Sequence, residues 1–420
     1  MLQEIAELER LAERSGLKEK YKSWFEALKL SLDIELLAAL KNMLLAEIKE
    51  PFAKPGAERL AQPAKKDHIN RILLGFTMGG AITLELEEVK RNILVGGQIS
   101  TGKTSFLLNI VSQLIAHGIN VWVFDFKREY YDQLQELDVL EIHWKDLRIN
   151  PFWMLDDDPY NNLEVAVRIL THLAGLEQAG LRIMADVAHE LFFERFHLDK
   201  QDKPLEDYPS LEGAYELLKG KKFPRGTQSY LSADRVLAHL HHLLQMGHGL
   251  FDCSRGFPLE ELAEHNIIFV FQGLDEICAQ VAAESLIAAL YRWKLRSQAF
   301  DQPLSHVVIS DEAKHLFDIR IEQRQQFQHP YIVHLLAEAR ASGLGFIFAD
   351  QLPHQLAVAL RENSYTKVAF RLGEAIDIKV MADSMALDDE QRQYLARLDV
   401  GEAIVQIGRE PAYKIKVPHK

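Results

Sequence analysis

The residues best suited to chemistry lie in a glycine-bracketed stretch between an apolar run and a helical pattern. The stretch NILVGGQISTGKTSFLL, at 92–108, contains Gly97 and then Gly102-Lys103-Thr104. This is the G-x-x-x-x-G-K-[ST] pattern in the setting that it requires, after a strand and before a helix. There, backbone amides wrap the phosphates of a nucleoside triphosphate, Lys103 reaches the β- and γ-phosphates, and the Thr104 oxygen ligates Mg²⁺. The alternative is a glycine turn with a surface lysine. The predicted nucleotide-binding residues are Gly97, Ser100, Thr101, Gly102, Lys103, Thr104 and Ser105.

The metal ion of a phosphate loop needs a carboxylate site as well, and an acidic pair after another apolar run can supply it. The run HVVISDEAKHLF ends its strand-like part in Asp311-Glu312. Ligands of α/β proteins lie at the carboxyl ends of strands, so we expect Asp311 in the Mg²⁺ shell through water. We expect Glu312 to position and deprotonate the attacking water. The alternative is that the pair caps the following helix.

Four further positions follow strands or helices of the same pattern. Gln351 follows LGFIFAD, where its amide could sense the γ-phosphate or orient water, or simply begin a helix. Arg340 ends a helical pattern, where a cation complements the helix dipole. Asp125 and Glu129 in VFDFKREYYDQL could support the catalytic water or the phosphate loop, or they could belong to a solvated turn.

The elements that must position these residues are strand-like runs that alternate with helical patterns. A hairpin is expected around Gly79-Gly80, and two short strands are expected around a turn at 408–411. Between them, strands are predicted at NILVGG, NVWVFDF, NIIFVFQ, HVVISDE, LGFIFAD and TKVAFRL. This alternation is typical of an α/β fold whose mostly parallel sheet is covered on both faces.

The patterns divide the chain into five predicted regions. Apolar residues at helical spacing, such as Ile5, Leu8 and Leu28, predict a helical region at 1–50, and proline and glycine predict a linker at 51–67. The nucleotide-binding core is expected in two parts, 68–160 and 247–420, separated by a helical insertion at 161–246.

Composition limits the classes of function. The net charge of −13 argues against a bulk basic surface that coats nucleic acid, although a local basic channel remains open. The two cysteines provide no disulfide framework and no metal-ligand cluster, and the histidines on helical patterns lack the spacing of a metal set. No apolar run reaches the roughly 18 residues of a membrane span, and the acidic N-terminus differs from a signal peptide. We therefore expect a soluble, cytoplasmic protein without membrane insertion.

In the order and spacing of these motifs, about four fifths of the chain resembles the HerA/FtsK superfamily of ring-forming ATPases. The matching stretches are LGFTMGGAITLELEEVKRNILVGGQISTGKT, VFDFKREY, RINPFW, VVISDEAKHLF and ARASGLGFIFADQ. The sequence departs from the family in its loop, which reads GQISTGKT rather than T-G-S-G-K, and in a helical N-terminus where HerA proteins have a β-barrel.

The resemblance implies a RecA-like P-loop fold, ATP and Mg²⁺ as cofactors, and a homo-oligomeric, usually hexameric, ring. It makes Gln351 the γ-phosphate sensor and Arg340 the arginine that reaches the nucleotide of a neighbouring subunit. It also implies double-stranded DNA, or sometimes protein, as the substrate drawn through the pore. Candidate DNA contacts lie in two charged stretches, for which a solvated loop is the alternative. They are Lys219, Lys221, Lys222, Arg225, Arg320 and Arg324.

Two other functions stay open on the sequence. The ring could scaffold or gate a partner effector such as a nuclease of phage defence, with the N-terminal helices as the docking surface. It could also be a conjugation or secretion motor that an adaptor docks to a membrane channel.

Overall fold

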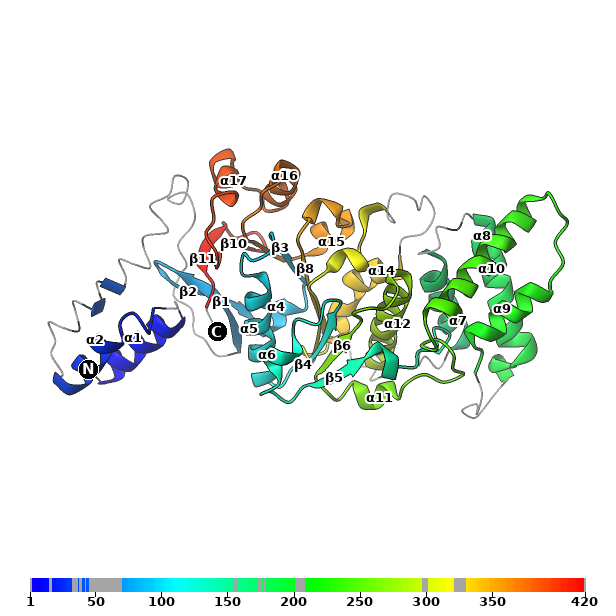
Figure 1. Cartoon of the computed structure of the whole chain (residues 1–420), viewed down its shortest axis with the longest axis horizontal. Helices are drawn as coiled ribbons and strands as arrows, with labels where there is room; N and C mark the ends of the chain where they lie inside the picture. Colours follow the sequence, from blue (N-terminus) through cyan, green and yellow to red (C-terminus); the bar gives the residue numbers. More distant parts are fainter. Residues whose placement is uncertain are drawn as a thin grey trace. The chain divides into compact units, whose positions relative to one another are not determined.

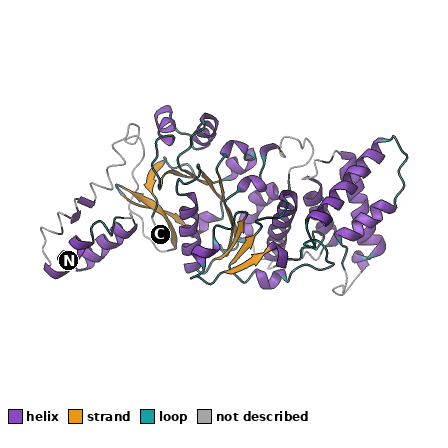
Figure 2. Cartoon of the chain, in the orientation of Figure 1, coloured by secondary structure: helices purple, strands orange, loops and turns teal. Residues whose placement is uncertain are grey.

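The computed structural model describes most of the chain in two compact units (Figures 1 and 2). The described residues are 2–14, 17–31, 37, 40, 41, 43, 44, 70–153, 158–172, 176, 178–200, 208–296, 301–320 and 330–418. The first unit contains Met1–Gly118, Ile347–His354 and Ser364–Lys420, and the second contains Ile119–Phe346 and Gln355–Asn363.

The strands of the first unit follow the order β2-β1-β11-β10-β9-β3-β8. Their bounds are β1 Arg71–Thr77, β2 Gly80–Glu85, β3 Ile93–Gly96, β8 Leu344–Asp350, β9 Thr366–Ala369, β10 Glu402–Ile407 and β11 Tyr413–Lys416. Strand β3 runs parallel to both β8 and β9, and the remaining pairs are antiparallel. Entirely buried, β3 is an apolar run of four residues, as a strand covered on both faces requires. The helices of this unit are α1 Leu2–Arg14, α2 Lys22–Ser31, α4 Leu86–Val89, α5 Lys103–Ala116, α16 Ala375–Ser384 and α17 Asp389–Leu395.

The N-terminal helices α1 and α2 have an apolar cluster of their own. Ile5 and Leu8 of α1 meet Phe25 and Leu28 of α2, and Leu40 belongs to the same cluster. The amphipathic helices predicted here are therefore present where the structure describes the chain. The predicted linker at 51–67 lies outside the described residues.

The strands of the second unit follow the order β7-β4-β6-β5, and all their pairs are parallel. They are β4 Asn120–Asp125, β5 Leu140–His143, β6 Ile267–Val270 and β7 His306–Ser310. The longer helices are α7 Pro159–His172, α8 Gln178–His189, α9 Leu211–Gly220, α10 Gln228–Met246, α12 Glu276–Leu295 and α14 Tyr331–Glu338. Shorter elements are α6 Tyr131–Leu134, α11 Leu259–Leu262, α15 Val358–Asn363, the 3-10 helices η3 Trp144–Asp146, η5 Leu198–Lys200, η6 Ala313–His315 and η7 Ala339–Ser342, and the π-helical turn η4 Glu190–Arg195. Helix α10 packs against α8 and α9, and α12 packs against α7 and α14 (Figure 1).

The predicted α/β P-loop fold is confirmed, and each strand predicted by name is present. Strand β5 was not predicted, because its alternation of apolar and polar residues, LEIH, extends over only four positions. Its side chains are half-buried or exposed. The helices between 159 and 246 fall where the helical insertion was expected. The division into five regions stays a prediction.

Candidate functional site

The phosphate-loop pattern joins β3 to α5, and its lysine is folded back onto the loop. Lys103 is only 5% exposed, and its Nζ donates to the carbonyl oxygens of Gly97 at 2.7 Å and Gln98 at 3.2 Å. The hydroxyl of Thr101 donates to the same Gln98 carbonyl at 2.7 Å. An ammonium group at this position faces the backbone concavity in which G-x-x-x-x-G-K-T loops hold phosphate.

Both glycines of the pattern are required by the geometry. A Cβ on Gly97 would lie 2.5 Å from the Cβ of Phe370, whose ring meets Phe106 of α5 edge-on with centroids 5.7 Å apart. Gly102 has a φ of 111° at the N-terminus of α5, in the region that L side chains rarely adopt. The loop therefore brings backbone amides and a helix N-terminus together, the combination that binds anions.

The remaining loop residues differ in exposure. Ser100 is exposed with a φ of 59°, Thr104 is half-buried and Ser105 is exposed. Thr104 offers a hydroxyl oxygen and Asp311 a carboxylate, each within its own unit. Hard oxygen donors of this kind are the ligands that Mg²⁺ prefers, so the two residue types fit the predicted metal.

Gln351 lies beside the phosphate loop in the first unit. Strand β8 pairs with β3 in a register that sets Asp350 opposite Gly96, and the Gly97 amide donates to the Asp350 carbonyl at 3.2 Å. Gln351 follows directly and is half-buried. The structure thus brings together two predicted positions that are about 250 residues apart in sequence.

Glu312, in the second unit, is held by a lysine and a histidine. Its Oε1 lies 2.5 Å from Nζ of Lys127, and its Oε2 lies 3.1 Å from Nε2 of His315. The His315 ring stacks on Phe126, with centroids 4.4 Å apart, and its Nδ1 lies 3.3 Å from Glu276. Burial opposes the charge, but the bonds from His315 and Lys127 prevail and lower the pKa of Glu312 from 4.5 to about 2.

Asp125 organises the loop from which Lys127 extends. Its two carboxylate oxygens accept the backbone amides of 127–130, at 2.7 to 3.1 Å. Burial outweighs these bonds and raises the pKa of Asp125. Asp125 therefore holds the turn that follows its own strand, whereas support of the phosphate loop or of the catalytic water stays a prediction. Burial, together with the negative charges of Asp311 and Asp125, raises the pKa of Tyr130 well above its usual range.

Arg340 is exposed on the 3-10 helix η7. Among the described residues, no ion pair of its guanidinium is found. Gly343 ends this helix with a φ of 74° and leads into β8. A long, exposed cation on a fixed turn can reach a ligand outside its own chain.

The candidate DNA contacts divide into paired and exposed side chains. Lys219 lies 2.9 Å from Glu216, Lys221 lies 2.5 Å from Glu190, and Arg320 is paired with Asp318. Lys222 and Arg225, on the loop between α9 and α10, are exposed. Arg324 lies outside the described residues.

Sequence reasoning missed Lys127 and His315 as neighbours of Glu312. Lys127 lies in the VFDFKREY stretch, but only the parallel pairing of β4 with β7 brings the ends of these strands level. His315 is three residues after Glu312, and the 3-10 helix η6 turns its side chain back toward that carboxylate. Nothing in the sequence indicated this turn.

The strand, phosphate loop and helix, with an acidic pair after a parallel strand, give the chain the fold of a P-loop NTPase. More particularly, the chain shares its fold with two solved bacterial structures. VirB4 of Thermoanaerobacter pseudethanolicus is 15% identical and has a TM-score of 0.66, over 85% of this chain and 99% of that one. The bacterial conjugative coupling protein TrwB is 13% identical and has a TM-score of 0.61, over 84% of this chain and 89% of that one.

A curated relative is named as a probable helicase of Methanocaldococcus jannaschii. It is 24% identical over 347 residues, which are 78% of this chain. The chain spans 64% of the length of that relative. No protein-family model matches the chain. Within the described part of the chain, every helix is too short or too polar to cross a membrane.

Proposed function

We propose that this chain is a Mg²⁺-dependent ATPase of the HerA/FtsK type, which works as a ring and couples ATP hydrolysis to translocation of double-stranded DNA. The observation that carries the proposal is the phosphate loop itself, in which a buried lysine and two sterically required glycines lie at a helix N-terminus. TrwB has been solved with ADP and Mg²⁺, which supports the choice of nucleotide and metal.

Each predicted residue has a separate task in this proposal. The loop amides and Lys103 bind the phosphates and stabilise the charge that develops during transfer. Thr104 and Asp311 would hold Mg²⁺, the latter through water, and the bound metal would neutralise charge on the phosphates. Glu312 positions the attacking water and Gln351 senses the γ-phosphate. Because the pKa of Glu312 is about 2, its carboxylate is ionised at neutral pH and ready to accept a hydrogen bond from water.

We propose a ring, in which Arg340 of one copy completes the nucleotide site of its neighbour. Its exposure and fixed turn support this role. An arginine supplied in trans accelerates phosphoryl transfer roughly 10³- to 10⁵-fold in other P-loop enzymes. An isolated chain should therefore bind ATP and hydrolyse it slowly. We propose a hexamer.

Double-stranded DNA is proposed as the substrate, with Lys222 and Arg225 as the contacts of first choice, because they are exposed on one loop. Lys219, Lys221 and Arg320 would exchange a carboxylate partner for phosphate. Such contacts grip the backbone without reading bases, and they weaken steeply as salt rises.

Two observations favour other tasks for the same ATPase. The fold shared with a bacterial conjugative coupling protein favours, of the two, the conjugation or secretion motor. The separate apolar cluster of α1 and α2 favours a docking module for an effector such as a nuclease.

The test compares ATPase rates with and without linear duplex DNA at low salt, together with native mass with and without nucleotide. We expect stimulation by DNA and a ring mass with ATP. Lys103→Ala should abolish nucleotide binding, whereas Arg340→Ala should bind normally and hydrolyse roughly 10³-fold more slowly. Arg409→Ala, another exposed arginine, is the matched control. A wild-type rate in assembled Arg340→Ala contradicts the shared site. An ATPase rate that DNA does not change, together with a protein that co-purifies with the chain, favours the alternative in which α1 and α2 dock an effector.

A further inference from the structure

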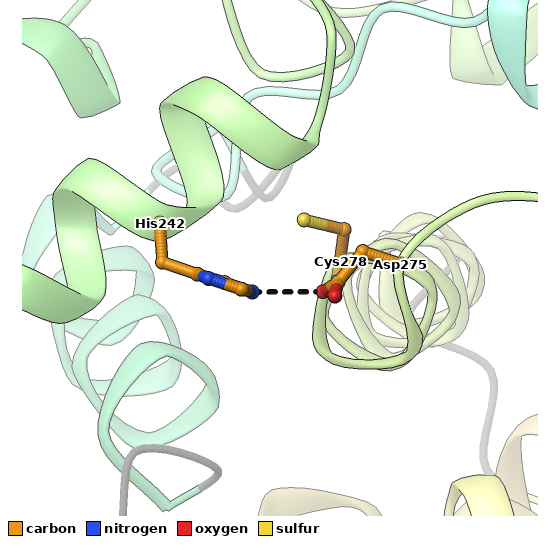
Figure 3. Close-up of side chains that lie close together, drawn as sticks. All are labelled: His242, Asp275 and Cys278. Atoms are coloured by element: carbon orange, nitrogen blue, oxygen red, sulfur yellow. Dashed lines mark hydrogen bonds and ion pairs between the residues drawn. The ribbon is translucent and has the colours of Figure 1, made fainter.

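Three metal-ligating side chains meet in the second unit, where α10 passes the N-terminus of α12. They are His242 of α10, Asp275, which precedes α12, and Cys278 of its first turn (Figure 3). Nε2 of His242 lies 2.9 Å from Oδ1 of Asp275. The three ligand atoms all lie within 4.8 Å of one another.

The backbone fixes this arrangement from both sides. Asp275 caps α12, because its Oδ1 accepts the amides of Ile277 and Cys278, each at 3.1 Å. The spacing of three residues places the thiol on the same side as the carboxylate. The Cys278 thiol also approaches the carbonyl of Leu243, the residue after His242, at 3.9 Å. The cluster is therefore set by the packing of two helices rather than by an exposed loop.

The donor set selects a class of cation. One imidazole nitrogen, one carboxylate oxygen and one sulfur are the ligands of Zn²⁺ and related transition metals, whereas Mg²⁺ and Ca²⁺ prefer oxygen alone. Three protein ligands leave a fourth tetrahedral position for water. Cys278 is fully buried, but the side chains of His242 and Asp275 are 36% and 22% exposed, so an ion can enter from their side.

We propose that His242, Asp275 and Cys278 form a Zn²⁺-class binding site that joins α10 to the N-terminus of α12. Binding requires the thiolate and a lone pair on Nε2 of His242. The thiol proton leaves to solvent as the metal–sulfur bond forms, and the ring proton moves from Nε2, where it bonds Asp275, to Nδ1. Because binding releases this thiol proton, the affinity should rise with pH.

Cobalt titration of the untagged, chelator-treated full chain tests the proposal. One equivalent of Co²⁺ should produce the thiolate-to-cobalt charge-transfer band, and Zn²⁺ should abolish it by displacement. Cys278→Ser should remove the band, and His242→Gln should weaken Co²⁺ binding at least tenfold. Cys253→Ser, which removes the other cysteine, is the matched control and should keep the band.

Folding is checked separately, because Asp275 also caps a helix. Asp275→Asn retains a capping oxygen and should leave circular dichroism unchanged while weakening Co²⁺ binding. Zn²⁺ should raise the Tm of the wild type and leave that of Cys278→Ser unmoved. A band that survives in Cys278→Ser, or a wild type that gives no band, overturns the site. Neither result bears on ATP hydrolysis, so the two proposals fail independently.

Discussion

Removal of Lys127 should change the proton affinity of Glu312. The pKa of Glu312 lies at about 2 instead of 4.5, a difference that corresponds to roughly 3 kcal/mol in favour of the ionised form. Lys127 shares this effect with His315 and is itself 40% exposed, so solvent screens part of its contribution. In Lys127→Met we therefore expect the pKa of Glu312 to rise by roughly one pH unit or more, since each unit is worth about 1.4 kcal/mol.

The consequence for the proposed hydrolysis follows from the sign of this change. Water is oriented by the ionised carboxylate, so activity is lost as the pH falls through the pKa of Glu312. A higher pKa moves that loss upward, toward the pH range in which the protein can be assayed. At neutral pH the carboxylate stays charged but loses the cation that fixes one oxygen, and kcat should fall by roughly tenfold, about 1.4 kcal/mol.

The assay is the ATPase rate of the assembled protein from neutral to acid pH, in wild type and Lys127→Met. Arg128→Met is the matched control, because Arg128 extends from the same loop toward Glu141 rather than Glu312. We expect its acid limb to coincide with that of the wild type. If the limb of Lys127→Met coincides as well, the ion pair does not set the proton affinity of Glu312 and the reasoning is wrong.

Three further predictions concern the fold and the loop. Lys414→Met should destabilise the protein by about 3 to 5 kcal/mol in urea unfolding, because it removes the ammonium that lies 2.8 Å from the buried carboxylate of Glu402. Lys416→Met, at a half-buried position of the same strand, removes only a bond of 3.4 Å to the Val400 carbonyl and should cost less; equal losses would contradict this. Gly97→Ala should weaken the binding of a fluorescent ATP analogue and cost about 1 to 3 kcal/mol of stability, since the new Cβ has no space, and unchanged binding would show that the loop adapts. The pKa of His172 is raised, despite burial, by its glutamate partner at 2.9 Å, so the stability from this pair should be complete below pH 6.5 and lost as the pH rises through the folded-state pKa. In His172→Gln, the free energy of unfolding in urea should not show this decrease with pH. If the wild type does not show the decrease either, the pair does not contribute to stability.

Local patterns predicted the phosphate loop and most strands, because their determinants lie within a few residues. The loop needs Gly97, Gly102 and Lys103 at fixed spacing between a strand and a helix, and the buried strands are short apolar runs bounded by turn residues. The hairpin around Gly79-Gly80 was visible for the same reason. Its strands, β1 and β2, pair on either side of that turn.

The contacts that the sequence did not reveal depend on register and helix packing. Lys127 meets Glu312 only because β4 and β7 pair in parallel with their ends level. His242 meets Cys278 only because α10 crosses the start of α12, and the spacing of 36 residues between them carries no signal. Strand β5 was not predicted because it is only four residues long, and its side chains are half-buried or exposed. Long-range geometry of this kind is set by the whole fold.

The bonds of Lys103 to its own loop bear on the thermodynamics of ligand binding. Because its ammonium satisfies the carbonyls of Gly97 and Gln98, the loop already has internal bonds that favour its curved shape. When a nucleotide binds, Lys103 would then exchange these bonds for bonds to phosphate, and the loop would not have to be ordered from a flexible state. Such an exchange carries a small entropic cost and a modest net enthalpy, so affinity should depend chiefly on the phosphate charge that outcompetes two neutral carbonyls. Diphosphate and triphosphate should then differ more in enthalpy than in entropy when their binding is measured by calorimetry.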